Sequence, residues 1–144
     1  MSIITKTDAE IELMREPCAI VRDTLAFVGE RIRAGMSTKE VDELVEKFIR
    51  AAGAYPSCLG YGGFPASACV SINETVVHGI PDEKTILKDG VIVSVDLCAY
   101  KNGFHGDAAR TFLIGNVSEE KRLLVERTKE CFFKGIENLR AGTP

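Results

Sequence analysis

The alternation of apolar and polar positions predicts three amphipathic helices and a strand-rich centre. The first helical stripe follows a capping box that runs from Thr7 to Glu10, with apolar residues at alternating spacings of three and four. Pro17 predicts a kink or a restart in this helix, and Gly35 predicts its end. The stripe consists of Ile11, Met14, Cys18, Val21, Leu25, Val28 and Ile32.

The other two helices show the same signals. A second capping box starts at Ser37, and the apolar stripe of the helix that follows ends at Gly53. Ser118 caps a third helix, whose end is predicted by Gly142 and Pro144. Between the second helix and the centre, residues 55–66 form a Gly/Pro-rich loop, 67–73 a short strand and 74–81 a further loop. The two stripes are Val41, Leu44, Val45, Phe48 and Ile49, then Val125, Thr128, Phe132, Ile136 and Leu139.

The central stretch predicts an antiparallel hairpin. Residues 91–98 alternate with a period of two, Asn102-Gly103 is a turn signal, and residues 104–114 form the return strand. Asp96 and Asp107 are symmetric about a point between Lys101 and Asn102, so we expect them opposite each other on one face with Cβ atoms about 5 Å apart. A divalent metal between them would relieve their repulsion.

The hairpin leaves other interpretations open. The aspartates can be surface residues paired with Lys101 or Arg110, and a bulge at Gly106 would move Asp107 to the other face. In the same register His105 falls opposite Cys98; this pair is a conceivable ligand pair, which we interpret as structural.

Composition narrows the class of protein. A chain of 144 residues with 45% hydrophobic and 27% charged residues is typical of one globular domain. The net charge of −3 argues against a nucleic-acid partner, and no apolar run resembles a membrane span or a signal peptide. Five cysteines without a C-x-x-C pair predict reduced thiols and a cytoplasmic location.

Several motifs in order resemble the amino-terminal half of type I methionine aminopeptidases, peptidase family M24. They are CLGYGGFP, SACVSINETVVHGIP and LKDGVIVSVDLCAYKNGFHGDAARTF. The resemblance implies an α/β (α+β) fold, half of a pita-bread (creatinase/aminopeptidase) fold with an antiparallel sheet and covering helices. Residues 1–117 would be its first half and 118–144 the first helix of its second half. The repetition of Arg-Ala-Gly at 33–35 and 140–142 agrees with such an internal repeat.

The resemblance also implies an activity, the removal of the initiator methionine from peptides by a hydrolase. Asp96 and Asp107 match ligands of two divalent metal ions (Co, Mn, Fe or Zn), and His78 matches the histidine that hydrogen-bonds the scissile peptide. The expected methionine pocket consists of Cys58, Tyr61, Phe64 and Cys69, although a tyrosine is frequent at the position of Phe64.

The remaining ligands of the family, a histidine and two glutamates, and its second catalytic histidine have no counterpart here, because the only histidines are His78 and His105. Two alternatives to an active enzyme follow. One is a catalytically incompetent half-domain that keeps the fold and part of the pocket. The other is self-association through the truncated edge, including a homodimer in which Asp96 and Asp107 occur twice.

Overall fold

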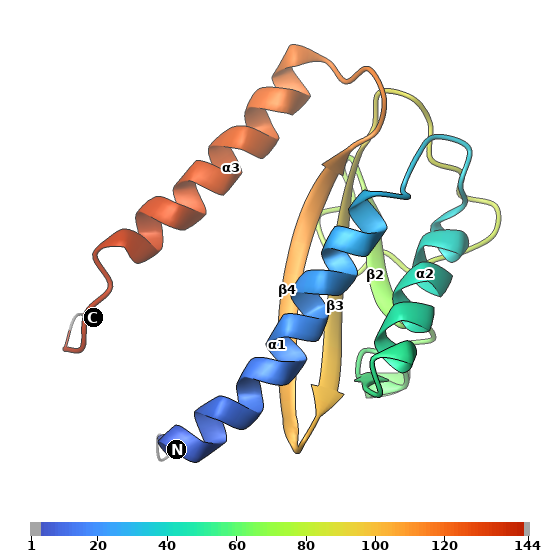
Figure 1. Ribbon diagram of the computed structural model, residues 1–144. Helices are drawn as coiled ribbons and strands as arrows, with labels where there is room; N and C mark the ends of the chain where they lie inside the picture. The colour runs from blue at the N-terminus through green and yellow to red at the C-terminus, as the bar shows by residue number, and fades with distance from the viewer. Residues whose placement is uncertain (1–3, 143–144) are drawn as a thin grey trace.

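Strand β3 (Ile92–Lys101) is the centre of the antiparallel sheet in the computed structural model, which describes residues 4–142 (Figure 1). Strand β4 (Phe104–Leu113) pairs with β3 along its whole length. On the other edge of β3, β1 (Tyr55–Pro56) pairs near its end and β2 (Ala68–Ile72) pairs further back. The strands predicted over residues 67–73, 91–98 and 104–114 are thus confirmed, and the loop at 55–66 contains the short strand β1 and a 3-10 turn, Tyr61–Gly63.

Helices α1 (Asp8–Gly29) and α2 (Thr38–Ala51) cover one face of this sheet (Figure 1). Both predicted capping boxes are present, with Thr7 and Ser37 as the N-caps. The predicted end of the first helix at Gly35 is wrong. The backbone of Gly35 instead donates to Leu87 at 2.9 Å, and Leu87 donates to Met36 at 2.8 Å, so pairing with a distant segment replaces the helical hydrogen bonds.

Helix α1 passes through Pro17 as one continuous helix, so the predicted restart does not occur. Pro17 is buried, and its backbone lies so close to β4 that a Cβ on Gly106 would be 2.5 Å from the Pro17 carbonyl. Packing of α1 against the sheet therefore offsets the hydrogen bond that proline removes. The buried stripe of α1 also differs from the prediction, because Ile11 and Cys18 are exposed.

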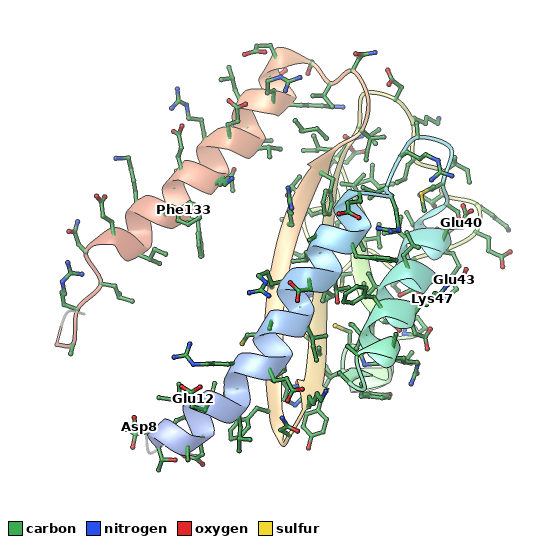
Figure 2. The ribbon with its side chains drawn as sticks, in the orientation of Figure 1. Asp8, Glu12, Glu40, Glu43, Lys47 and Phe133 are labelled. Carbon is green, nitrogen blue, oxygen red and sulfur yellow. The ribbon has the colours of Figure 1, made fainter. Side chains whose placement is uncertain are left out.

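The core lies between these helices and the sheet. Four alternate residues of β3, namely Val93, Val95, Leu97 and Ala99, have no exposed surface and face the helices. Burying each of the valine and leucine side chains among them contributes roughly 1.5–3 kcal/mol. The period of two then places the other residues of β3, including Asp96 and Cys98, on the opposite face. The charged side chains Glu40, Glu43 and Lys47 lie on the outer surface of α2 (Figure 2).

Helix α3 (Glu119–Glu137) follows the sheet and extends away from it (Figure 1). Ser118 caps it as predicted, accepting the Lys121 N–H at 3.4 Å, but none of its described residues is buried, and Phe133 is 54% exposed (Figure 2). It ends at Glu137, before Gly142; the predicted stop at Pro144 lies outside the described residues. Over residues 4–142, no helix is long and apolar enough to cross a membrane.

Candidate active site

The register of the β3–β4 hairpin decides where the two aspartates lie. Lys101 faces Phe104, so Asn102 and Gly103 are the two turn residues, both with positive φ (55° and 84°). A two-residue turn of this kind matches the twist of the strands. The ladder is therefore centred between Asn102 and Gly103, one residue beyond the predicted centre.

This shift changes the cross-strand partners without changing the face. Asp96 lies opposite Ala109, and Asp107 lies opposite Cys98, so the prediction that the aspartates are directly opposite is wrong. They are diagonal neighbours on the face away from the helices, because a slip of two residues preserves the side-chain alternation. The ladder is continuous, which also excludes the bulge considered at Gly106.

Among the described residues, no lysine or arginine forms an ion pair with either carboxylate. Lys101 instead pairs with Glu16 at 2.7 Å, and the guanidinium of Arg110 lies 5.1 Å from the Phe112 ring centroid, on the helix-facing side. The predicted alternative of salt bridges from these cations is thus wrong. Partial burial, followed by the charge of Asp107, raises the pKa of Asp96 above its usual value.

The donor set suits a divalent cation in kind but is incomplete. Carboxylate oxygens are ligands that divalent metals accept, and no Lys or Arg within residues 4–142 forms an ion pair with either carboxylate. Within residues 4–142, however, no group of three or more His, Cys, Asp or Glu side chains is arranged to hold a metal ion. Asp96 and Asp107 alone therefore do not make a complete metal centre.

His78 is placed near Asp96 by an unusual backbone segment. The neighbouring Gly79 carbonyl accepts the Val70 N–H at 2.9 Å, and the Gly79 N–H donates to Ser71 Oγ at 3.1 Å. His78 itself has φ of 57°, in the left-handed region that non-glycine residues seldom adopt. The residue is exposed, and its interaction with Asp96 acts in the direction that lowers the aspartate pKa. The structure thus brings His78 and Asp96 together.

Two of the four predicted pocket residues lie beside the aspartates. Cys69 is directly opposite Asp96 in the β2–β3 ladder and is buried. Burial, followed by the charges of Cys58 and Asp96, raises the pKa of Cys69 to about 11. Cys58 follows β1, and a hydrogen bond with the Cys98 thiol lowers its pKa. These cysteines and the two aspartates form one cluster.

The aromatic pocket residues lie on the tight turn that follows Cys58. Two hydrogen bonds close this turn, from the Gly60 N–H to the Phe64 carbonyl at 2.8 Å and from the Phe64 N–H to the Tyr61 carbonyl at 2.9 Å. Phe64 is half-buried, whereas Tyr61 is 83% exposed. The role of both rings in a methionine pocket stays a prediction.

Cys98 is the residue that sequence reasoning undervalued. The Cys98/His105 ligand pair, which was conceivable in the predicted register but interpreted as structural, does not form, because His105 lies opposite Tyr100 and its Nδ1 is 2.9 Å from Ser57 Oγ. Cys98 instead lies opposite Asp107, and its interactions with Cys58 and Asp107, together with burial, raise its pKa. The alternation along β3 already placed Cys98 on the same face as Asp96. The pairing of β1 with β3 was not predictable, because β1 consists of only two residues.

Comparisons with known proteins show which family the chain is similar to. Residues 12–144 match metallopeptidase family M24. The chain is 51% identical over 140 residues to a methionine aminopeptidase of Clostridium acetobutylicum, covering 97% of this chain and 56% of that protein. It is 46% identical over 140 residues to methionine aminopeptidase 1 of Bacillus subtilis, again covering 97% of this chain and 56% of that protein.

Among solved structures, a methionine aminopeptidase from Thermotoga maritima superposes with a TM-score of 0.93 at 37% identity, covering 96% of this chain and 56% of that one. The fold is therefore the expected half of a pita-bread architecture. The chain spans about half the length of the relatives it matches. The family match covers nearly all of the described residues, and the chain belongs to metallopeptidase family M24.

Proposed function

We propose that this chain is the amino-terminal part of a methionine aminopeptidase, which removes the initiator methionine from peptides in the cytoplasm. The observation that carries the proposal is the open sheet face on which Asp96 and Asp107 lie together without a neutralising cation, beside His78 and Cys69. In this proposal residues 1–117 form the first half of the catalytic domain, and residues 118–144 carry the first helix of the second half.

The side chains have distinct roles in this proposal. Asp96 and Asp107 would be ligands of a pair of divalent ions (Co, Mn, Fe or Zn), and the rest of the donors would come from outside this chain. His78 would donate a hydrogen bond to the scissile peptide. Cys58 and Cys69 would contact the substrate methionine, because a polarizable thioether packs well against sulfur and aromatic groups. Tyr61 and Phe64 would complete that pocket from the turn beside it.

A second candidate, a catalytically incompetent half-domain, is favoured by the donor count. A two-metal site holds ions about 3.5–4 Å apart with several ligands, and residues 4–142 offer no group of three. A general base, which typically contributes about 10²–10⁴-fold in rate, has no evident candidate beside the aspartates either. We therefore expect the 144-residue chain alone to have negligible aminopeptidase activity.

The proposal is tested by supplying the missing part. A chimera that continues residue 144 with the carboxyl-terminal part of the Clostridium acetobutylicum relative should release methionine from Met-Ala-Ser with Co²⁺ or Mn²⁺, and Asp96→Asn or Asp107→Asn should abolish the release. Asp23→Asn, on the exposed side of α1, is the matched control that keeps activity. A folded, metal-loaded chimera without methionine release would contradict the proposed function.

The isolated chain distinguishes the remaining alternatives. Turnover of Met-Ala-Ser by the purified 144-residue chain that disappears in Asp96→Asn would contradict incompetence and indicate reconstitution by a homodimer. The exposed apolar side chains of α3, such as Leu124 (58%) and Phe132 (63%), support self-association of the chain. Sedimentation of the wild type beside a Leu124→Ser, Phe132→Ser variant measures it directly.

A further inference from the structure

Residues 57–64, the segment that begins the predicted methionine pocket, are held by the central sheet where they start. The Ser57 N–H donates to the Cys98 carbonyl of β3 at 3.0 Å, and Ser57 directly precedes Cys58. The Tyr61 N–H in turn donates to the Cys58 carbonyl at 3.1 Å, so the turn that follows starts from Cys58. The position of Cys58 therefore depends on how Ser57 is held.

A second hydrogen bond reaches Ser57 from the far strand of the hairpin. Nδ1 of His105, on β4, lies 2.9 Å from Ser57 Oγ, although the two residues are 48 positions apart in the sequence. His105 lies opposite Tyr100 of β3, and the centroids of the two rings are 4.8 Å apart. Because β4 and β1 pair with opposite edges of β3, the imidazole crosses the central strand to reach the segment that follows β1.

The Ser57–His105 hydrogen bond lies on the face of the sheet that carries the two aspartates. Tyr100 is four residues from Asp96 and His105 is two residues from Asp107, so strand alternation places both rings on that face. The aspartates themselves are held by the continuous β3–β4 ladder and not by Ser57. Loss of the hydrogen bond should therefore release the segment that carries Cys58 and leave the two carboxylates in place.

We propose that His105 is a positioning residue for the methionine side chain of the substrate, because its hydrogen bond to Ser57 fixes where Cys58 faces the pocket. This inference rests on the proposed function, in which Cys58 contacts the substrate methionine. An interaction that shapes a binding pocket without touching the reacting atoms acts on the ground state and the transition state alike. Its loss therefore raises KM and leaves kcat nearly unchanged.

The chimera described above tests this role with variants at both ends of the hydrogen bond. Ser57→Ala and His105→Ala should each raise KM for Met-Ala-Ser by about 2–10-fold, as expected for one hydrogen bond of ordinary net strength, with kcat nearly unchanged. The double variant should be no worse than either single variant, because both changes remove the same bond. Ser57→Thr keeps the hydroxyl and His105→Asn places an amide group where Nδ1 lies, so both conservative variants should restore the KM. Asp23→Asn, on the exposed side of α1, should change neither constant.

Amide hydrogen exchange of the 144-residue chain, followed by NMR, measures the same hydrogen bond without any enzyme activity. The N–H groups of Ser57 and Leu59 are both hydrogen-bonded at the start of the segment and should exchange faster in Ser57→Ala and His105→Ala than in the wild type. The Gly35 N–H, which is hydrogen-bonded elsewhere in the fold, should exchange as in the wild type.

Each failure gives a different result. Unchanged exchange at Ser57 and Leu59 in His105→Ala would overturn the proposed hold on the segment, and an unchanged KM in an active chimera would overturn its role in methionine binding. A kcat that falls in His105→Ala but not in Ser57→Ala would also overturn the proposal, because it would assign the effect to the neighbouring Asp107. A wild-type chimera that releases no methionine would instead contradict the proposed function, and the substrate role of His105 would fall with it.

Discussion

The buried carboxylate of Asp42 on α2 accepts the backbone N–H of Ser67 at 2.7 Å. It also accepts the N–H of Ala68 at 3.0 Å and pairs with the Lys39 ammonium at 2.8 Å, and the residue is only 1% exposed. These two N–H groups lie at the start of β2, the strand that carries Cys69 opposite Asp96. A single side chain of α2 thus fixes where the strand enters the candidate site.

Replacing this carboxylate should destabilise the protein. Asp42→Ala leaves two buried N–H groups without an acceptor and Lys39 without its partner, so we expect the free energy of unfolding to fall by about 2–4 kcal/mol. Asp42→Asn keeps one acceptor and should lose less. Urea unfolding followed by circular dichroism measures both. The control is Asp23→Ala, which removes only an exposed ion pair with Arg22. An Asp42→Ala variant as stable as this control would refute the role of Asp42.

Replacing glycine with alanine should lower the stability of the protein at Gly106, which packs against Pro17, and raise it at Gly135. In Gly106→Ala the new Cβ would lie 2.5 Å from the backbone of Pro17, so α1 must move away from β4, at a cost of about 1–3 kcal/mol. In Gly135→Ala, on exposed α3, the Cβ meets no atom within 4 Å. That variant should gain about 0.5–1 kcal/mol of helix stability. Thermal unfolding of the two variants checks the sign, and a stabilising Gly106→Ala would contradict the packing.

The sequence predicted the elements whose signals are local. The second helix is an example, because the signals that set its position, the Ser37/Glu40 capping box and a stripe of apolar residues, lie in the helix itself or at its N-cap. The face shared by Asp96 and Asp107 was also predictable, since strand alternation preserves it under any slip of two residues. Their direct partners were not, because these depend on which residues occupy the turn.

Features set by distant contacts were not predictable from local pattern. The end of α1 at Gly29 depends on the pairing of Gly35 with Leu87, and the uninterrupted passage through Pro17 depends on Gly106. The contact of Cys58 with Cys98 depends on β1, whose two residues carry no periodic signal. In each case tertiary packing selected among conformations that the local sequence left open.

The backbone of His78 predicts how its substitutions rank in stability. A φ of 57° costs an ordinary residue roughly 1–2 kcal/mol, while asparagine and glycine adopt this region more readily. We therefore expect His78→Asn and His78→Gly to be more stable than His78→Ala by about 1 kcal/mol. Differential scanning calorimetry of the three variants tests the order. If His78→Ala is the most stable of them, the left-handed conformation does not persist in solution.

The same variants separate stability from function in the chimera described above. The proposed role of His78 is a hydrogen bond to the scissile peptide, so His78→Asn should lower methionine release although it preserves the backbone. Asn73 also has a positive φ, of 48°, in the same segment. Asn73→Gly permits this conformation but removes the hydrogen bond that the Asn73 side chain accepts from the Ile92 N–H at 3.2 Å, and we expect it to keep the activity. If His78→Asn keeps the activity and Asn73→Gly loses it, the activity depends on the backbone shape of residues 73–78 and not on a hydrogen bond from the His78 ring.

The raised pKa of Asp96 predicts how stability depends on pH in the absence of metal. Burial and the nearby charge of Asp107 make the folded state bind the Asp96 proton more tightly than the unfolded state, whose pKa lies near the model-peptide value of 3.8. As pH rises from below 3.8 through the raised pKa, the unfolded chain ionises first, so stability falls. Asp96→Asn removes this ionisation. The melting temperature of Asp96→Asn should therefore rise relative to that of the wild type as pH increases, in buffer containing a chelator.

Asp23 provides a control of opposite sign. The Arg22 guanidinium lowers the pKa of Asp23, so its contribution to stability is present above the unfolded-state pKa and is lost as pH falls through the folded-state value. Relative to Asp23→Asn, the wild type should therefore gain stability as pH rises, by a small amount because the pair is exposed. Melting temperatures of both variants and the wild type across the acidic range give the two slopes. If Asp96→Asn follows the wild type in parallel at every pH, the two carboxylates do not interact as the sheet places them.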